Sequence, residues 1–107
     1  MISLSSHVLD TTRGVPAEAM ELILTTPDLQ EFKGVTDKDG RCRDWGIEKF
    51  EPGIYQIRFE CKEYLLRHYE QTLYPFVDIH FEMTSDGGHY HIPLLISPFG
   101  FSSYRGS

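Results

Sequence analysis

Hydrophobic and polar residues alternate along most of this chain, and this period of two is typical of β-strands with one buried face. The clearest apolar stripes consist of every second residue in five segments: Ile2, Leu4 and Val8; Met20, Leu22 and Leu24; Tyr55, Ile57, Phe59 and Cys61; Val77, Ile79, Phe81 and Met83; Tyr90, Ile92, Leu94 and Ile96. Phe32–Thr36 and Phe99–Tyr104 are expected to form two further short strands. The polar residues of each strand then lie on the face opposite the core.

One segment departs from this alternation and predicts a short helix at Lys62–Tyr69. Cys61, Leu65 and Tyr69 are spaced four residues apart, which places them on one side of a helix. Glycine, proline and aspartate punctuate the rest of the chain at short intervals, as expected for turns between many short strands. Seven or eight strands and one helix predict an all-β sandwich, and a chain of 107 residues suits a single domain spanning residues 1–107.

The net negative charge of the chain argues against nucleic acids and anionic membranes as partners. The formal net charge is −6, whereas nucleic acids and anionic membranes are bound by basic surfaces. No stretch approaches the roughly 20 apolar residues of a membrane span. The first residues lack the basic and apolar regions of a secretory signal, so we expect a cytoplasmic protein. Cys42 and Cys61 show no metal-binding spacing and are expected to be reduced, buried thiols.

Two of the five histidines are candidates for catalysis. His7 and His91 lie on the strand faces opposite the apolar stripes, with hydroxyl or apolar neighbours, so another subunit could cover them. Histidine is the natural general acid or base near neutral pH. His68, near the helix end, and His80, between two acidic residues, are interpreted as ordinary surface groups.

A metal site is an alternative interpretation of the same region. His89 and His91 fall on one face of a strand, as in several zinc sites. A catalytic zinc needs about three protein ligands, and the third would have to be His7 or a carboxylate that the spacing does not identify. The common signatures of other enzymes, GxSxG, GxGxxG, HExxH and the Walker loop, are absent.

Arginines and the last ten residues supply the remaining candidates. Arg41 and Arg43 follow the turn at Thr36–Gly40 and are either solvated or held beside a substrate anion or carbonyl. The segment Pro98–Ser107 is aromatic and hydroxyl-rich to its last residue, whereas frayed termini are usually polar. We therefore expect this tail to dock, with its terminal carboxylate near polar partners.

Several motifs, in order and over nearly the whole chain, resemble those of 5-hydroxyisourate hydrolases: Ser6–Asp10, Thr36–Arg41, Tyr74–Phe76, His89–Pro98 and Tyr104–Ser107. The tetrapeptide Tyr104-Arg105-Gly106-Ser107 is the most specific of them, and transthyretins, the hormone-carrying relatives on the same fold, lack it. The resemblance implies a transthyretin-like β-sandwich of two four-stranded sheets, with one short helix after the fifth strand. It also implies a homotetramer whose active sites lie in a channel at the dimer–dimer interface.

The resemblance further implies a reaction and a set of site residues. The ring of 5-hydroxyisourate would be opened by water to give 2-oxo-4-hydroxy-4-carboxy-5-ureidoimidazoline, a step of urate degradation. The implied catalytic residues are His7, Arg41 rather than Arg43, His91 and Ser107, with His7, Arg41 and Tyr104 binding the substrate. No metal or organic cofactor is expected. Whether His7 or His91 is the general base stays open.

Three other functions compete with this hypothesis. A transthyretin-like carrier of a small aromatic ligand would use the histidines only as channel lining. A zinc-dependent hydrolase would use His89 and His91, and a structural interaction domain would use neither. In the hydrolase hypothesis, the faces that carry His7 and His91 are open to the tail of a neighbouring subunit.

Overall fold

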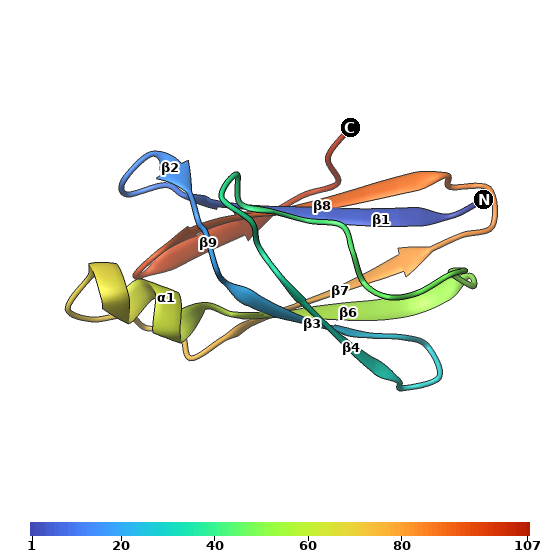
Figure 1. Cartoon of the computed structure of the whole chain (residues 1–107), viewed down its shortest axis with the longest axis horizontal. Coiled ribbons are helices and arrows are strands. Elements are labelled where there is room, and N and C mark those ends of the chain that lie inside the picture. The colour runs from blue at the N-terminus through green and yellow to red at the C-terminus, as the bar shows by residue number, and fades with distance from the viewer.

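The computed structural model describes residues 1–107 as nine strands and one helix (Figure 1). In chain order the elements are β1 (Ser3–Asp10), β2 (Val15–Pro16), β3 (Glu21–Thr25), β4 (Glu31–Val35), β5 (Arg41–Cys42), β6 (Gly53–Glu60), α1 (Cys61–His68), β7 (Val77–Met83), β8 (His89–Ser97) and β9 (Gly100–Ser103). All the long strands and the helix lie where the sequence pattern places them. The two-residue strands β2 and β5 are too short to show a period.

The strands form two sheets that lie one above the other (Figure 1). One sheet has the order β2-β1-β8-β9, with β5 also paired to β1, and the other has the order β4-β3-β6-β7. β1 and β8 run parallel, and the other pairs are antiparallel. The predicted all-β sandwich is confirmed in class. Two details differ, since β5 adds a fifth strand to one sheet and the helix follows the sixth strand.

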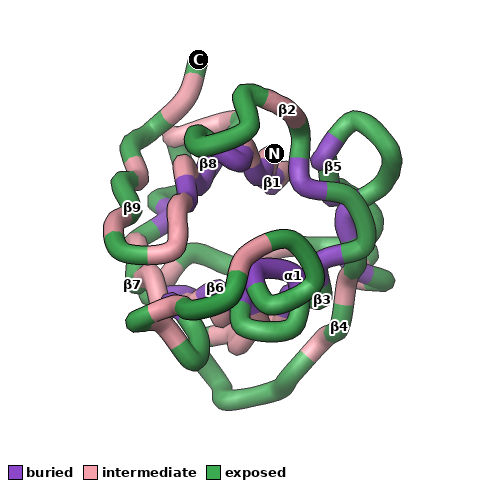
Figure 2. The backbone as a smooth tube through the Cα atoms, turned by 90° about the vertical axis from the view of Figure 1, so that its left-hand side faces the viewer, coloured by how far each residue is buried: buried purple, intermediate pink, exposed green.

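The core lies between the two sheets, where the apolar stripes meet. Leu22, Ile57 and Leu94 are completely buried there, and each belongs to a stripe that the alternation predicts. Figure 2 views the two sheets end-on, with β1 and β8 above β3 and β6. Buried and less buried residues alternate along β1 and β6. The opposite faces of β1 and β8 are only half-buried, and they are the faces that carry His7 and His91.

A buried carboxylate fastens the helix to the end of β1. The carboxylate of Asp10 accepts hydrogen bonds from the hydroxyls of Tyr64 (2.9 Å) and Tyr69 (2.7 Å) and from the backbone N–H groups of Thr12 and Arg13 (3.1 Å each). Burial by itself raises the pKa of the carboxyl, but the four donors outweigh it and hold that pKa below the ordinary 3.8. Asp10 is therefore a structural anion of the core.

The two cysteines are free and buried, as expected. Burial raises the pKa of Cys42 and of Cys61 to about 11, so both are protonated thiols near neutral pH. They take no part in the site described below as nucleophiles, because the thiolate is the reactive form.

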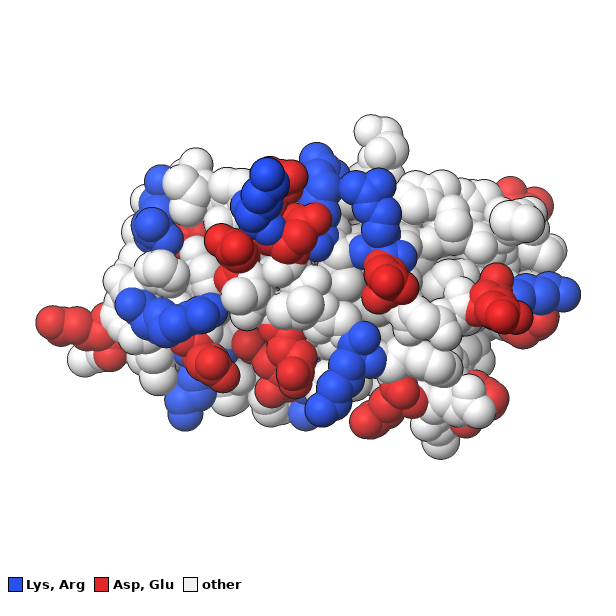
Figure 3. All heavy atoms as spheres, viewed as in Figure 1, with Lys and Arg blue, Asp and Glu red and all other residues white.

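The surface carries both signs of charge. Lys and Arg side chains alternate with Asp and Glu over the face shown in Figure 3, without a continuous basic patch. The helix α1 is not long or apolar enough to cross a membrane.

Candidate active site

The pairing of β1 with its two neighbours assembles a polar site on the outer face of one sheet. Parallel pairing with β8 places Ser5 beside His91, and antiparallel pairing with β5 places His7 beside Arg41. The intervening residues of β1 are buried, so these side chains point away from the core. Figure 1 shows the C-terminal tail above β1 and β8, on the side opposite the second sheet.

A cavity of about 260 Å³ opens on this face, and none of its lining residues is hydrophobic. Its lining is formed by Ser5, Ser6, Arg41, Arg43, His89, His91 and Ser107. Three of the five predicted site residues, Arg41, His91 and Ser107, therefore meet there. The ring of His7 lies beside the cavity, with its centroid 6.3 Å from that of His91. Tyr104 is 59% exposed and does not line the cavity.

The tail docks on its own strand β8. The backbone N–H of Gly106 donates to the carbonyl of His91 at 2.7 Å, in an isolated bridge beyond the end of β9. The guanidinium of Arg105 donates to the carbonyl of Gly87 at 2.9 Å and lies 4.2 Å from the centre of the Tyr90 ring. In this arrangement the chain brings its own Ser107 to its own His91.

The close approach of the tail to His91 requires glycine at position 106. A Cβ atom at this position would overlap the imidazole of His91, which lies against the tail backbone. Only glycine lets the backbone come this close, so the side chain of Ser107 reaches the cavity.

His7 is oriented by the turn that precedes β5. Its Nε2 lies 2.9 Å from the backbone carbonyl of Asp39, and because a carbonyl only accepts, Nε2 carries the proton. The carboxylate of Asp37 shapes this turn by accepting the N–H groups of Asp39 and Arg41, and the bond from Arg41 is the main reason that the pKa of Asp37 is lowered. Nδ1 of His7 is consequently the ring nitrogen that does not face Asp39.

His91 is held in its neutral form. Its Nδ1 lies 2.7 Å from Oγ of Ser5. Burial is the main cause that lowers its pKa below the ordinary 6.5, and the nearby basic side chains of His7, Arg41 and His89 add to the effect. A neutral imidazole beside a polar cavity can accept a proton from water at neutral pH.

The donor set does not match the zinc hypothesis. His89 and His91 both direct a ring nitrogen at the same hydroxyl, that of Ser5, at 2.9 Å and 2.7 Å. No group of three His, Cys, Asp or Glu side chains is arranged to hold a metal ion. The third ligand that the zinc hypothesis requires is therefore not supplied by this chain.

Sequence reasoning missed Ser5 and His89 as parts of the site, and it set Arg43 aside. The alternation already places Ser5 on the face of His7, and it places His89 on the face of His91. The sequence predicts only a metal-binding role for His89, because the hydroxyl that lies between the two histidines belongs to Ser5, which is 84 residues away from His89 in the sequence.

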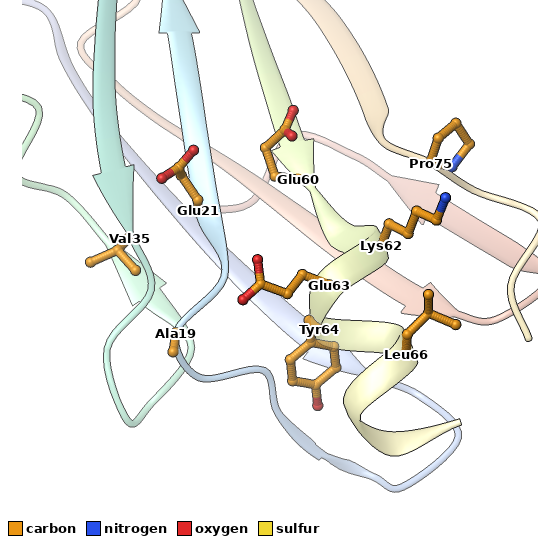
Figure 4. A pocket seen from close by; sticks show the side chains of 9 residues that line it. All are labelled: Ala19, Glu21, Val35, Glu60, Lys62, Glu63, Tyr64, Leu66 and Pro75. Carbon is orange, nitrogen blue, oxygen red and sulfur yellow. The ribbon is translucent and has the colours of Figure 1, made fainter. Parts of the chain in front are cut away.

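A second cavity, of about 540 Å³, lies at the helix end of the molecule. Figure 4 shows Glu21, Glu60 and Glu63 around it, extending from β3, β6 and α1. It contains neither histidine nor arginine, so it offers carboxylates and a lysine but no imidazole beside a guanidinium.

A two-sheet sandwich whose outer face carries a histidine–arginine cavity defines the class of this protein. The chain matches the model of the HIUase/Transthyretin family over residues 4–106, and it therefore belongs to that family. It is 36% identical to the 5-hydroxyisourate hydrolase of Salmonella dublin over 109 residues, which covers 97% of this chain and 80% of the relative.

Solved structures show the same fold. The chain is similar to the 5-hydroxyisourate hydrolase of Klebsiella pneumoniae, with a TM-score of 0.89, 31% identity and full coverage of both chains. It is also similar to transthyretin from Sparus aurata, with a TM-score of 0.87, 26% identity and coverage of 97% of this chain and 96% of the other. It matches (S)-allantoin synthase at a TM-score of 0.87 and 35% identity, and spans 44% of that longer chain.

Proposed function

We propose that this chain hydrolyses 5-hydroxyisourate to 2-oxo-4-hydroxy-4-carboxy-5-ureidoimidazoline in urate degradation. The observation that carries the proposal is the meeting of His91, Arg41 and Ser107 in one polar cavity, in a chain of the HIUase/Transthyretin family. A base, a cation and a polar substrate contact are the groups that hydrolysis of a cyclic amide requires.

His91 is the proposed general base. It lines the cavity, its pKa is lowered, and the hydrogen bond of Nδ1 to Ser5 leaves Nε2 for a water molecule. The water loses a proton to Nε2 as its oxygen attacks a ring carbonyl of the substrate. His7 lies beside the imidazole of His91 and is oriented by the carbonyl of Asp39. It assists in binding the substrate and the water.

Arg41 is the proposed partner of the carbonyl oxygen on which negative charge develops. Arg41 pairs with His7 in the β1–β5 ladder, and it lines the same cavity as His91 and Arg43. One preorganised donor of this kind lowers a barrier by about 3 kcal/mol. Ser107 is proposed to contact the substrate from the tail, and Tyr104 is proposed to contribute once a second subunit covers it.

We further propose a homotetramer with its sites at the dimer–dimer interface. β9 and β7 end their sheets, and unpaired edge strands invite pairing with another chain. Phe99, Phe101 and Tyr104 are exposed around β9, and exposed apolar patches are typical of interaction surfaces. Residues 1–107 are proposed to act as one hydrolase domain in the cytoplasm. Light scattering after size exclusion tests the assembly, and a monomer at micromolar concentration would contradict it.

The decay of freshly made substrate tests the function. Urate oxidase converts urate into hydroxyisourate, whose ultraviolet signal is followed with and without this protein. We expect decay to accelerate in proportion to protein concentration and to persist after treatment with a chelator. If the protein leaves the decay rate unchanged, the result would favour the alternative function, a carrier of a small aromatic ligand. The cavity has no hydrophobic lining, which does not suit such a ligand.

A further inference from the structure

A continuous chain of polar side chains leads from His91 to the surface. Oγ of Ser5 lies 2.7 Å from Nδ1 of His91 and 2.9 Å from Nε2 of His89. Nδ1 of His89 lies 2.6 Å from Oγ of Ser3. The parallel register of β1 and β8 creates this chain, because it pairs Ser3 with His89 and Ser5 with His91. His91 and Ser5 are half-buried, whereas His89 and Ser3 are exposed.

The directions of these hydrogen bonds depend on one another. The Ser5 hydroxyl has one proton, so it donates to one imidazole and accepts from the other. When His91 is protonated, its Nδ1–H donates to Ser5, and Ser5 must donate to an unprotonated Nε2 of His89. If both rings were protonated, two N–H groups would face one oxygen and the Ser5 proton would lose its partner. The pair therefore takes up a first excess proton more readily than a second.

We propose that Ser5 and His89 form a proton relay for His91, which moves positive charge from the half-buried ring of His91 to the exposed ring of His89 during hydrolysis. This inference rests on the proposed function. The water proton binds Nε2 of His91; the Nδ1 proton then moves to Oγ of Ser5 while the Ser5 proton moves to Nε2 of His89. When the leaving nitrogen takes the Nε2 proton of His91, the same transfers run in reverse. Only N–H and O–H bonds form and break, and no proton is gained or lost by the relay.

The surroundings of the two rings give the relay its direction. Arg41 and His7 lie beside His91 and oppose a positive charge there, and burial withholds the water that would solvate it. His89 is exposed, and its Nδ1–H is accepted by Ser3, so a cation on that ring is better solvated. Arg41 then acts on the developing oxyanion without a positive charge on the half-buried ring of His91.

Substitutions at His89 distinguish a role in proton transfer from a role as a hydrogen-bonding neighbour of Ser5. His89→Gln keeps a polar group toward Ser5 but cannot carry a proton, and Ser5→Ala breaks the chain. We expect each to lower kcat roughly tenfold or more with KM within about twofold. His89→Ala leaves room for imidazole from solution, which should restore its kcat but not that of Ser5→Ala. His80→Gln, an exposed histidine of the other sheet, is the matched control and should leave kcat unchanged.

Two results would overturn the relay. A His89→Gln variant with the kcat of the unmodified chain would overturn the relay, as would a His89→Ala variant with a raised KM and no response to imidazole. Thermal midpoints check that each variant is folded.

A readout independent of activity comes from the histidine Cε1 signals in an NMR titration. In the unmodified chain, His89 and His91 should take up their two protons in well-separated steps, and Ser5→Ala should bring the steps together. Independent titration of the two rings in the unmodified chain would refute the relay even if the chain hydrolyses hydroxyisourate. Coupled titration without any acceleration of hydroxyisourate decay would instead refute the proposed function, and with it the role of the relay in hydrolysis.

Discussion

Gly106→Ala is a one-carbon change that tests how the tail serves the site. The backbone of Gly106 does not adopt a positive φ, so alanine is conformationally allowed there. Its Cβ, however, would overlap the imidazole of His91, with Cγ of that ring 3.1 Å away and Cβ of His91 3.3 Å away. Either the ring or the tail must move.

The hydrogen bonds indicate that the tail moves. A displaced ring would give up its 2.7 Å bond to Ser5 within the half-buried site. A displaced tail gives up the bond from Gly106 to the carbonyl of His91, about 1 kcal/mol, and the exposed stacking of Arg105 on Tyr90, also ~1 kcal/mol. Ser107 then leaves the cavity, and the loss of one preorganised contact of about 3 kcal/mol lowers kcat/KM about a hundredfold.

The assay is the decay of hydroxyisourate, together with the free energy of unfolding in urea. Gly106→Ala should lose about a hundredfold in kcat/KM and only about 2 kcal/mol in stability. Gly100→Ala is the matched control, because its added Cβ meets nothing closer than Oγ of Ser97 at 3.6 Å. A Gly106→Ala variant as active as the control would refute the role given to the tail.

Three further changes are predicted. Arg41→Ala should lower kcat/KM by about a hundredfold, and because a positive charge is removed, the pKa of His91 should rise and the acid limb of the pH profile should move to higher pH. Deletion of Tyr104–Ser107 should leave a cooperatively folding protein that hydrolyses poorly, whereas an unfolded product would make the tail structural. Asp10→Asn should cost about 2–4 kcal/mol in urea unfolding at pH 7. Since the folded pKa of Asp10 lies below 3.8, that stability is present above about pH 4 and disappears as the pH falls through the folded value, so a difference that persisted in acid would contradict the assignment.

The alternation of the sequence predicts most of the fold, because a half-buried strand imposes its period on every residue. It correctly assigns His7 and His91 to the outer face of the sheet. It also places Asp10 on the buried stripe of β1, but the partners that make this burial tolerable, Tyr64 and Tyr69, come from the helix and the segment after it. No local pattern connects them.

The site depends on pairings between distant segments, which local patterns do not encode. Arg41 reaches the site because the two-residue strand β5 pairs with β1, and a strand of that length has no period to detect. Ser5 meets both histidines only through the parallel register of β1 and β8. The role of Gly106 likewise becomes visible only when the tail is seen against the His91 ring.

Replacement of His91 by asparagine tests the central claim most directly. Asparagine keeps a polar group that can bond to Ser5 but cannot accept a proton at neutral pH. With hydroxyisourate as substrate, we predict a fall in kcat of at least about a hundredfold for His91→Asn, while His80→Asn, measured alongside, retains full activity. A folded His91→Asn variant that turns over hydroxyisourate at the rate of the unmodified chain would contradict the assignment of this cavity as the active site.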